Sequence, residues 1–241
     1  MRKGRLIQIA QPMDGYAYTS DSLFLYHFAL DFIPQGARVL DIGAGSGVLG
    51  LLCARDVQVS LTMVEKTSKM AFFARRNTEA ANIEAEVIEA DFLELKPEIP
   101  QSFDIAISNP PFYSSGHLKS PNPTISAAKS EENLPFESLL AHLKQFLKPR
   151  GDFIFCFASR ECDRVFKSLL ESYFKVEVVR FVHPKSNRDA TLLLCKAKLG
   201  SKTPTHVLPP LFVYENDDFS QEVRAIFKAA CAHSIKAQME C

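Results

Sequence analysis

Short runs of β-branched and apolar residues alternate with amphipathic stretches along most of this chain, and this alternation limits the possible folds most strongly. Strands that alternate with helices imply a parallel sheet with helices on both faces. A further helix over 20–33, capped by Ser20 or Asp21, is expected before the first strand. The expected strands are 37–41, 57–65, 85–89, 103–108 and 151–158, and the expected helices are 47–55, 68–81, 136–147 and 160–173.

Two more strands, 174–182 and 190–196, follow without a helix between them. The link His183–Asp189 is too short for a parallel crossover, so these strands are predicted to form an antiparallel hairpin. The pattern therefore predicts an α/β, Rossmann-like fold. Its sheet is mostly parallel and seven-stranded, with the antiparallel hairpin at its C-terminal end.

The length and composition favour one large domain. A chain of 241 residues, 46% of them hydrophobic, fits a single domain over 1–241 with a sizeable core. We divide it into an N-terminal helical cap (1–35), a Rossmann-like core (36–200) and a C-terminal extension (201–241). No apolar run approaches the roughly 18 residues of a membrane span, and no apolar signal segment follows the basic start. We therefore expect a cytoplasmic monomer without a membrane partner.

The six cysteines and the charges give weaker indications. The cysteines include no Cys-x-x-Cys pair, so free thiols and no metal site are expected. The net charge is zero, but 180–202 carries six basic residues against one acid. Such a segment can bind a phosphate backbone through residues such as Lys185 and Arg188, or can simply be a solvated face.

A glycine-rich turn follows the first core strand, in the sequence Asp41-Ile-Gly43-Ala-Gly45-Ser-Gly47. Glycines at a strand-to-helix turn let the backbone approach a ligand without Cβ atoms between them. The N-terminus of the next helix adds unpaired amides. The turn therefore predicts a nucleotide-type cofactor site that includes Gly43, Gly45 and Gly47.

Acidic residues at the ends of the first three core strands indicate which cofactor this is. Asp41 is placed to accept from the ammonium of a methionine moiety, and Glu65 from both ribose hydroxyls. Asp91 is placed to accept from an adenine amino group, whose ring Phe92 can cover. A nicotinamide-dependent oxidoreductase is the competing interpretation, because Gly45–Gly50 also fits G-x-G-x-x-G. The combination favours S-adenosylmethionine and the class I methyltransferase fold.

The fourth core strand ends in Ser108-Asn109-Pro110-Pro111-Phe112. The Asn109 side-chain oxygen and the Pro110 carbonyl can accept the two N–H bonds of an exocyclic amine, and Phe112 can stack on an extruded base. No strong general base is needed, because the nitrogen becomes acidic as it is methylated. Positioning and electrostatics then carry the catalysis, and a plain Pro-Pro turn is the alternative.

These motifs together resemble the tRNA (adenine-37-N6) methyltransferases that modify a valine tRNA. The resemblance suggests that Tyr18 and Thr19 border the methionine side of the pocket. It implies cofactor or substrate binding by Asp41, Glu65, Asp91 and Asn109. The matching stretches cover most of the chain: 18–25, 41–47, 109–112, 182–185, 208–214 and the helix expected over 219–228.

One departure leaves the target base open. The family usually has Tyr where this chain has Phe112, and guanine-N2 rRNA methyltransferases often carry Asn-Pro-Pro-Phe, although they commonly have an extra N-terminal half that this chain lacks. A protein-glutamine N5-methyltransferase uses the same motif on an amide, usually with a separate helical domain. A non-catalytic RNA-binding factor would keep the fold without the reaction. The expected function is methyl transfer to an exocyclic amine, with adenine N6 in tRNA as the first choice.

Overall fold

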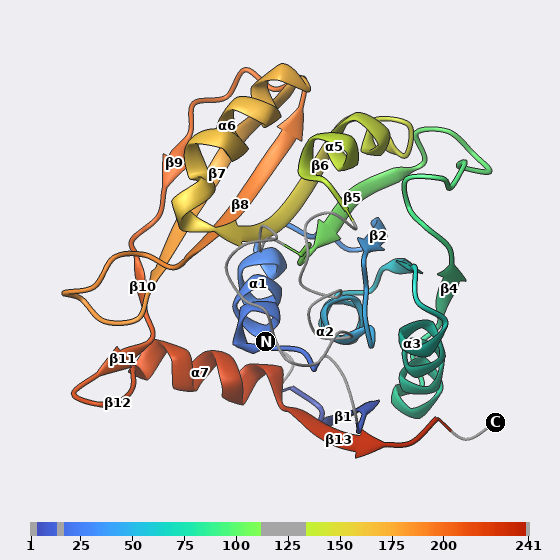
Figure 1. The fold of residues 1–241 in the computed structure, drawn as a ribbon, viewed down its shortest axis with the longest axis horizontal. Helices are drawn as coiled ribbons and strands as arrows, with labels where there is room; N and C mark the ends of the chain where they lie inside the picture. Colours follow the sequence, from blue (N-terminus) through green and yellow to red (C-terminus); the bar gives the residue numbers. More distant parts are fainter. Residues whose placement is uncertain (1–3, 14–16, 112–133, 240–241) are drawn as a thin grey trace.

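A mostly parallel sheet forms the centre of the computed structural model, which describes residues 4–13, 17–111 and 134–239 (Figure 1). Its strand order β4-β3-β2-β5-β6-β8-β7 contains the seven expected strands, with β8 antiparallel to both neighbours and the others parallel. The strands are β2 (Arg38–Ile42), β3 (Ser60–Glu65), β4 (Ala85–Glu89), β5 (Phe103–Ser108), β6 (Leu147–Ala158), β7 (Phe174–His183) and β8 (Leu192–Leu199). The predicted α/β sheet and its antiparallel hairpin are confirmed.

The sheet is wider than the seven strands predicted. The two-residue strands β9 (His206–Val207) and β10 (Leu211–Phe212) both pair parallel to β7. They come from the C-terminal extension, which also forms a short hairpin of β11 (Tyr214–Glu215) and β12 (Asp218–Phe219). Strands of two residues carry no readable alternation, so the sequence pattern missed them.

The helices cover both faces of this sheet. From β2 the chain runs outward through β3 to β4, whereas β5 and β6 extend the sheet in the other direction. Because parallel crossovers are right-handed, this reversal places the helices of the two halves on opposite faces. The helices are α1 (Ser20–Leu30), α2 (Val48–Asp56), α3 (Ser68–Ala81), α5 (Phe136–Leu143), α6 (Cys162–Glu171) and α7 (Gln221–Ala230), with a short 3₁₀ turn over Ser159–Glu161.

Several expected boundaries differ from the observed ones, among them the capping residue at the start of α1 and the end of α5. Thr19, not Ser20 or Asp21, is the residue that precedes the first turn of α1. The helix α5 ends at Leu143 and not at the expected residue 147, and β6 begins at Leu147 and runs through Pro149-Arg150-Gly151, although its strand was expected to start at 151. Leu147 pairs with Phe103 of β5, and the ladder then shifts register before Asp152, with Arg150 at φ 64°. Pairing with β5 therefore accommodates the breaker residues as an irregularity within a strand.

The N-terminal segment is more than the helical cap expected for 1–35. It begins with β1 (Ile7–Pro12), which pairs in parallel with β13 (Ala232–Ala237) near the end of the chain (Figure 1). Buried Asn77 of α3 holds β1 in place. Its Oδ1 accepts from the Ala10 amide at 2.7 Å, and its Nδ2 donates to the Ala10 and Ser46 carbonyls. Because Ser46 belongs to the glycine-rich turn, Asn77 joins that turn to β1.

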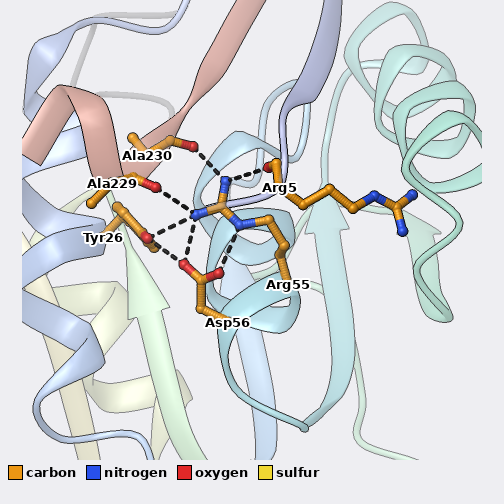
Figure 2. Close-up of polar contacts among 6 residues, drawn as sticks. All are labelled: Arg5, Tyr26, Arg55, Asp56, Ala229 and Ala230. Carbon is orange, nitrogen blue, oxygen red and sulfur yellow. Dashed lines mark hydrogen bonds and ion pairs between the residues drawn. The ribbon is translucent and has the colours of Figure 1, made fainter. Parts of the chain in front are cut away.

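Arg55 of α2 connects the C-terminal extension to the core, as Figure 2 shows. Its side chain is 6% exposed, and the last carbonyls of α7, which have no partner within that helix, accept from it. The contacts therefore fix α7 against α1 and α2. The partners of the guanidinium are the main-chain carbonyls of Arg5, Ala229 and Ala230, the Tyr26 hydroxyl and the Asp56 carboxylate.

Within the described parts of the chain, we find no helix whose length and apolar character would let it span a membrane. The same residues contain no group of three His, Cys, Asp or Glu side chains arranged to hold a metal ion.

Candidate active site

An open pocket, about 400 Å³ including its solvent-filled mouth, lies where the sheet edge meets the start of α2. Five of the residues expected in the site line it: Tyr18, Asp41, Gly43, Gly45 and Asn109. They come from three segments that are distant in sequence. The carboxyl ends of neighbouring parallel strands meet at one edge of the sheet, which explains why β2 and β5 deliver Asp41 and Asn109 to the same place.

The glycine-rich turn has the conformation that its sequence requires. Gly43, Gly45 and Gly47 have φ values of 67°, 58° and 83°, in the region that favours glycine. A Cβ on Gly43 would have no neighbour within 4 Å, so the backbone there is open to a ligand. A Cβ on Gly47 would lie 3.1 Å from the Met63 sulfur. Gly47 thus serves the packing of α2 and does not line the pocket.

Asp41 is a buried carboxylate on the pocket wall, with 1% of its surface exposed. Its Oδ2 accepts a hydrogen bond from the Gly50 amide at 2.9 Å. Burial raises the pKa of Asp41 to about 7, nearby Glu65 adds to the rise, and the Gly50 bond opposes it. No cation among the described residues offsets this charge, so a cationic ligand group in the pocket would be stabilised by it.

Glu65 ends β3 and is 8% exposed. Its Oε2 accepts from the Gly45 amide at 2.9 Å, and its Oε1 accepts from the amide and hydroxyl of Thr67. These bonds fix the glycine-rich turn relative to β3. A carboxylate has about four acceptor positions, and three of them are used here. The expected contact of Glu65 with both ribose hydroxyls stays a prediction.

Asp91 and Phe92 follow β4 but do not line this pocket. The Asp91 carboxylate pairs with Lys66 at 2.7 Å and accepts from the Leu93 amide. Burial alone would raise the pKa of Asp91, but these two partners outweigh it and the pKa is lowered. The Phe92 ring is 4% exposed and packs against His142 and Phe146. Contacts of this pair with an adenine stay predictions.

Asn109 directly follows the last residue of β5. Its Nδ2 donates to the Ser22 hydroxyl at 3.0 Å, and its Oδ1 accepts from the Cys156 thiol at 3.0 Å. Ser108 donates its hydroxyl to the Ile42 carbonyl at 2.7 Å, which fixes the backbone just before Asn109. The predicted acceptor Pro110 is buried, and no amide of the described chain bonds to its carbonyl. Phe112 lies outside the described residues.

Tyr18 and Thr19 precede α1. Tyr18 lines the pocket, and its amide donates to the side chain of buried Gln11, while burial raises the pKa of its phenol. Thr19 does not line the pocket, but its hydroxyl is buried and has no hydrogen-bond partner among residues 4–13, 17–111 and 134–239. The structure therefore brings Tyr18 to the pocket but not Thr19, the next residue in the sequence.

The basic segment around the hairpin is largely neutralised by the chain itself. Lys185 pairs with Asp217, and Arg180 pairs with Glu222 through both terminal guanidinium nitrogens. Arg188 is exposed, and its carbonyl accepts from His183. Neither Lys185 nor Arg188 lines the pocket, so their contact with RNA stays a prediction.

Sequence reasoning missed Ser22, Cys156 and Asn77. Ser22 was expected only as part of a helix start, and Cys156 only as a buried thiol. The sequence carried no signal for Cys156, because its place beside Asn109 depends on the register of β5 and β6, in which Ser108 lies opposite Phe155. The residues that follow these two, Asn109 and Cys156, are then neighbours.

The fold and this site define a methyltransferase. The family model described as "Methyltransferase small domain" matches residues 19–181, and the chain belongs to that family. It is 28% identical, over 80% of each chain, to a tRNA1(Val) (adenine(37)-N6)-methyltransferase of Dyadobacter fermentans.

Solved structures agree on the class I methyltransferase fold. A predicted O-methyltransferase from Agrobacterium tumefaciens superposes with a TM-score of 0.67 at 21% identity, over 90% of this chain and 100% of its own. TYW2 of M. jannaschii, in complex with AdoMet, gives a TM-score of 0.52 at 16% identity, over 76% of this chain and 77% of its own.

Proposed function

We propose that this chain transfers a methyl group from S-adenosylmethionine to the exocyclic N6 of an adenine in tRNA. The observation that carries the proposal is the shared pocket, in which Asn109 faces the same space as the glycine-rich turn. A methyl donor and an amine acceptor need to meet in one such space. The name of the Dyadobacter fermentans relative supports adenine N6 and tRNA as the target.

The residues present fit the methyl donor. Gly43 leaves room for a close approach, Asp41 offers a buried negative charge to the ammonium, and Tyr18 closes one side of the pocket. Glu65 keeps the turn in its binding conformation through Gly45. When bound, S-adenosylmethionine supplies an electrophilic methyl group. We place the ribose near Glu65 and the adenine near Asp91 and Phe92.

Asn109 and Pro110 provide the chemistry toward the acceptor. An exocyclic amine is a poor nucleophile, since its lone pair is delocalised into the ring. Two carbonyl oxygens that accept its N–H bonds favour the pyramidal nitrogen and stabilise the positive charge that develops on it. The side-chain oxygen of Asn109 and the main-chain oxygen of Pro110 are those acceptors, and Phe112 is proposed to stack on the base.

The tRNA is proposed to reach the site over the hairpin link, with phosphates near Lys185 and Arg188. We further propose that the protein acts as a monomer, because a single copy already brings Asp41 and Asn109 to the same pocket. We propose the cytoplasm as its location, because that is where a tRNA substrate would be met.

One experiment separates the possible acceptors. The purified protein is incubated with methyl-labelled S-adenosylmethionine and, in separate reactions, with unmodified tRNA, with rRNA or with a protein extract. The nucleosides or amino acids released by digestion are resolved by mass spectrometry. We expect N6-methyladenosine. N2-methylguanosine in rRNA would move the target to guanine, label in a protein glutamine would move it to an amide, and RNA binding without any transfer would leave a non-catalytic factor.

A further inference from the structure

The Asn109 amide is held from two sides by residues that belong to different elements. Ser22, in the first turn of α1, lies at its nitrogen, and Cys156, near the end of β6, lies at its oxygen. Ser22 is 4% exposed and Cys156 is fully buried, so water does not compete freely at either contact. Asn109 itself is only half-buried and borders the pocket.

Backbone pairing and one side-chain hydrogen bond fix the position of the Asn109 main chain. Ser108 is the last residue of β5 and pairs with Phe155 in the parallel ladder, so the next residues on both strands lie side by side. The Ser108 hydroxyl also binds the end of β2 through Ile42. The position of the Asn109 backbone is thereby fixed, and the orientation of its side-chain amide is the remaining freedom.

That freedom matters because the two ends of an amide have almost the same shape and opposite hydrogen-bonding character. An Asn109 turned by half a rotation would present an NH₂ group to the substrate amine, and two donors would then face each other. Shape alone does not prevent this rotation. Only the hydrogen-bond partners can do so.

We propose that Ser22 and Cys156 are positioning residues for methyl transfer, which hold the Asn109 amide with its oxygen as the acceptor offered to the amine. This inference rests on the proposed amine methylation. A thiol donates a hydrogen bond but accepts only weakly, whereas the Ser22 hydroxyl does both. Cys156 therefore selects the oxygen end. Burial, followed by the charge of nearby Asp21, raises the thiol pKa, so Cys156 keeps its proton.

The contact with Cys156 leaves one acceptor position of the Asn109 side-chain oxygen free. A carbonyl oxygen has two lone pairs, so Asn109 Oδ1 can accept from the thiol and from a substrate N–H together. Sequence reasoning treated all cysteines alike, but the structure gives this one a donor role beside the reacting group.

The test compares Cys156→Ala, Cys156→Ser and Ser22→Ala with the matched control Cys195→Ala. Cys195 is also a buried thiol with a raised pKa, on the adjacent strand β8. It pairs with Phe155 and therefore points to the sheet face opposite Cys156. Removing it creates a similar small cavity without touching Asn109.

The measured quantities are kcat with unmodified tRNA, the KM for tRNA and the Kd for S-adenosylmethionine. Loss of one positioning hydrogen bond is expected to lower kcat about tenfold in Cys156→Ala and Ser22→Ala, with both binding constants within about twofold of wild type. The shorter hydroxyl of Cys156→Ser still donates and should recover most of the lost rate. Cys195→Ala should keep the wild-type kcat.

A second measurement separates positioning from simple packing. In an Asn109→Ala background, Cys156→Ala should lower kcat no further, because the group that it orients is gone. Equal losses with and without Asn109, or a kcat loss in Cys195→Ala equal to that in Cys156→Ala, would overturn the positioning role. Wild-type protein that methylates no tRNA would instead overturn the proposed function, so the two failures are distinguishable.

Discussion

The carboxyl edge of the sheet and the hairpin link 183–189 differ in how far their polar residues are buried and in what those residues bond to. At the edge, Asp41, Glu65 and Asn109 are removed at least partly from water, and each is hydrogen-bonded to another segment. In the link, the half-exposed side chain of Lys185 is paired with the nearby Asp217 carboxylate. A buried polar group is costly unless it is satisfied, whereas an exposed ion pair contributes little. Polar residues at the edge are therefore strong signs of a site, and charge counts in the link are weak ones.

The largest expected effect is at the edge. Asn109→Ala should lose methyl transfer by on the order of a hundredfold or more, as when one preorganised polar group is removed from an active site. Its Kd for S-adenosylmethionine should stay near the wild-type value, since the interaction is stronger in the transition state. Single-turnover transfer of labelled methyl to tRNA measures the loss. A wild-type rate would refute the amine-methylation assignment.

Glu65 comes next. Glu65→Ala should weaken S-adenosylmethionine binding about tenfold or more, through lost ligand contacts and a loosened Gly45 turn. Calorimetric titration gives the Kd. The matched control is Glu89→Ala on β4, because Glu89 pairs with Glu65 in the sheet but bonds Ser68 and Arg75 instead of the turn. Equal affinities in both variants would remove Glu65 from the site.

Asp41 should make stability and binding depend on pH in opposite directions. Its pKa is about 7 in the folded protein against 3.8 for the free group, so folding takes up a proton and stability falls as pH rises through this window. Asp41→Asn removes the buried charge. The free energy of unfolding of this variant should therefore exceed that of the wild type by an amount that grows between pH 4 and pH 7, to as much as a few kcal/mol.

The same variant should bind S-adenosylmethionine poorly at pH 7.5, where the wild-type carboxylate is largely ionised. Chemical denaturation and calorimetric titration at several pH values test both halves. If the unfolding free energy and the binding constant change with pH in the same way in the wild type and in Asp41→Asn, Asp41 does not titrate in this range.

The smallest effect belongs to the hairpin link. Replacing Lys185 and Arg188 by Glu should raise the tRNA KM several-fold and flatten its salt dependence, with unchanged cofactor affinity. Asp217→Asn should lower the KM at low salt, because it releases Lys185 from its partner. Lys167→Glu on α6 is the control, an exposed lysine paired with Glu171. Unchanged tRNA kinetics in the double variant would make the link ordinary solvated surface.

Local patterns of the sequence were enough for the core of the fold. The ranges 68–81, 85–89 and 103–108 match α3, β4 and β5 as predicted, since apolar periodicity and breakers act within a few residues. The glycine-rich turn was equally local, because only glycine adopts its φ values readily. These features also indicated which edge of the sheet would carry Asp41 and Asn109.

Tertiary structure decided everything that depends on which distant segments meet. The pairing of β1 with β13 joins the two ends of the described chain, and no periodicity in either segment names its partner. Lys185 looked free until Asp217 was brought beside it. Cys156 became a partner of Asn109 only through the register of β5 and β6. A sequence states which hydrogen bonds a residue can make, but the packing of the whole chain selects the ones it does make.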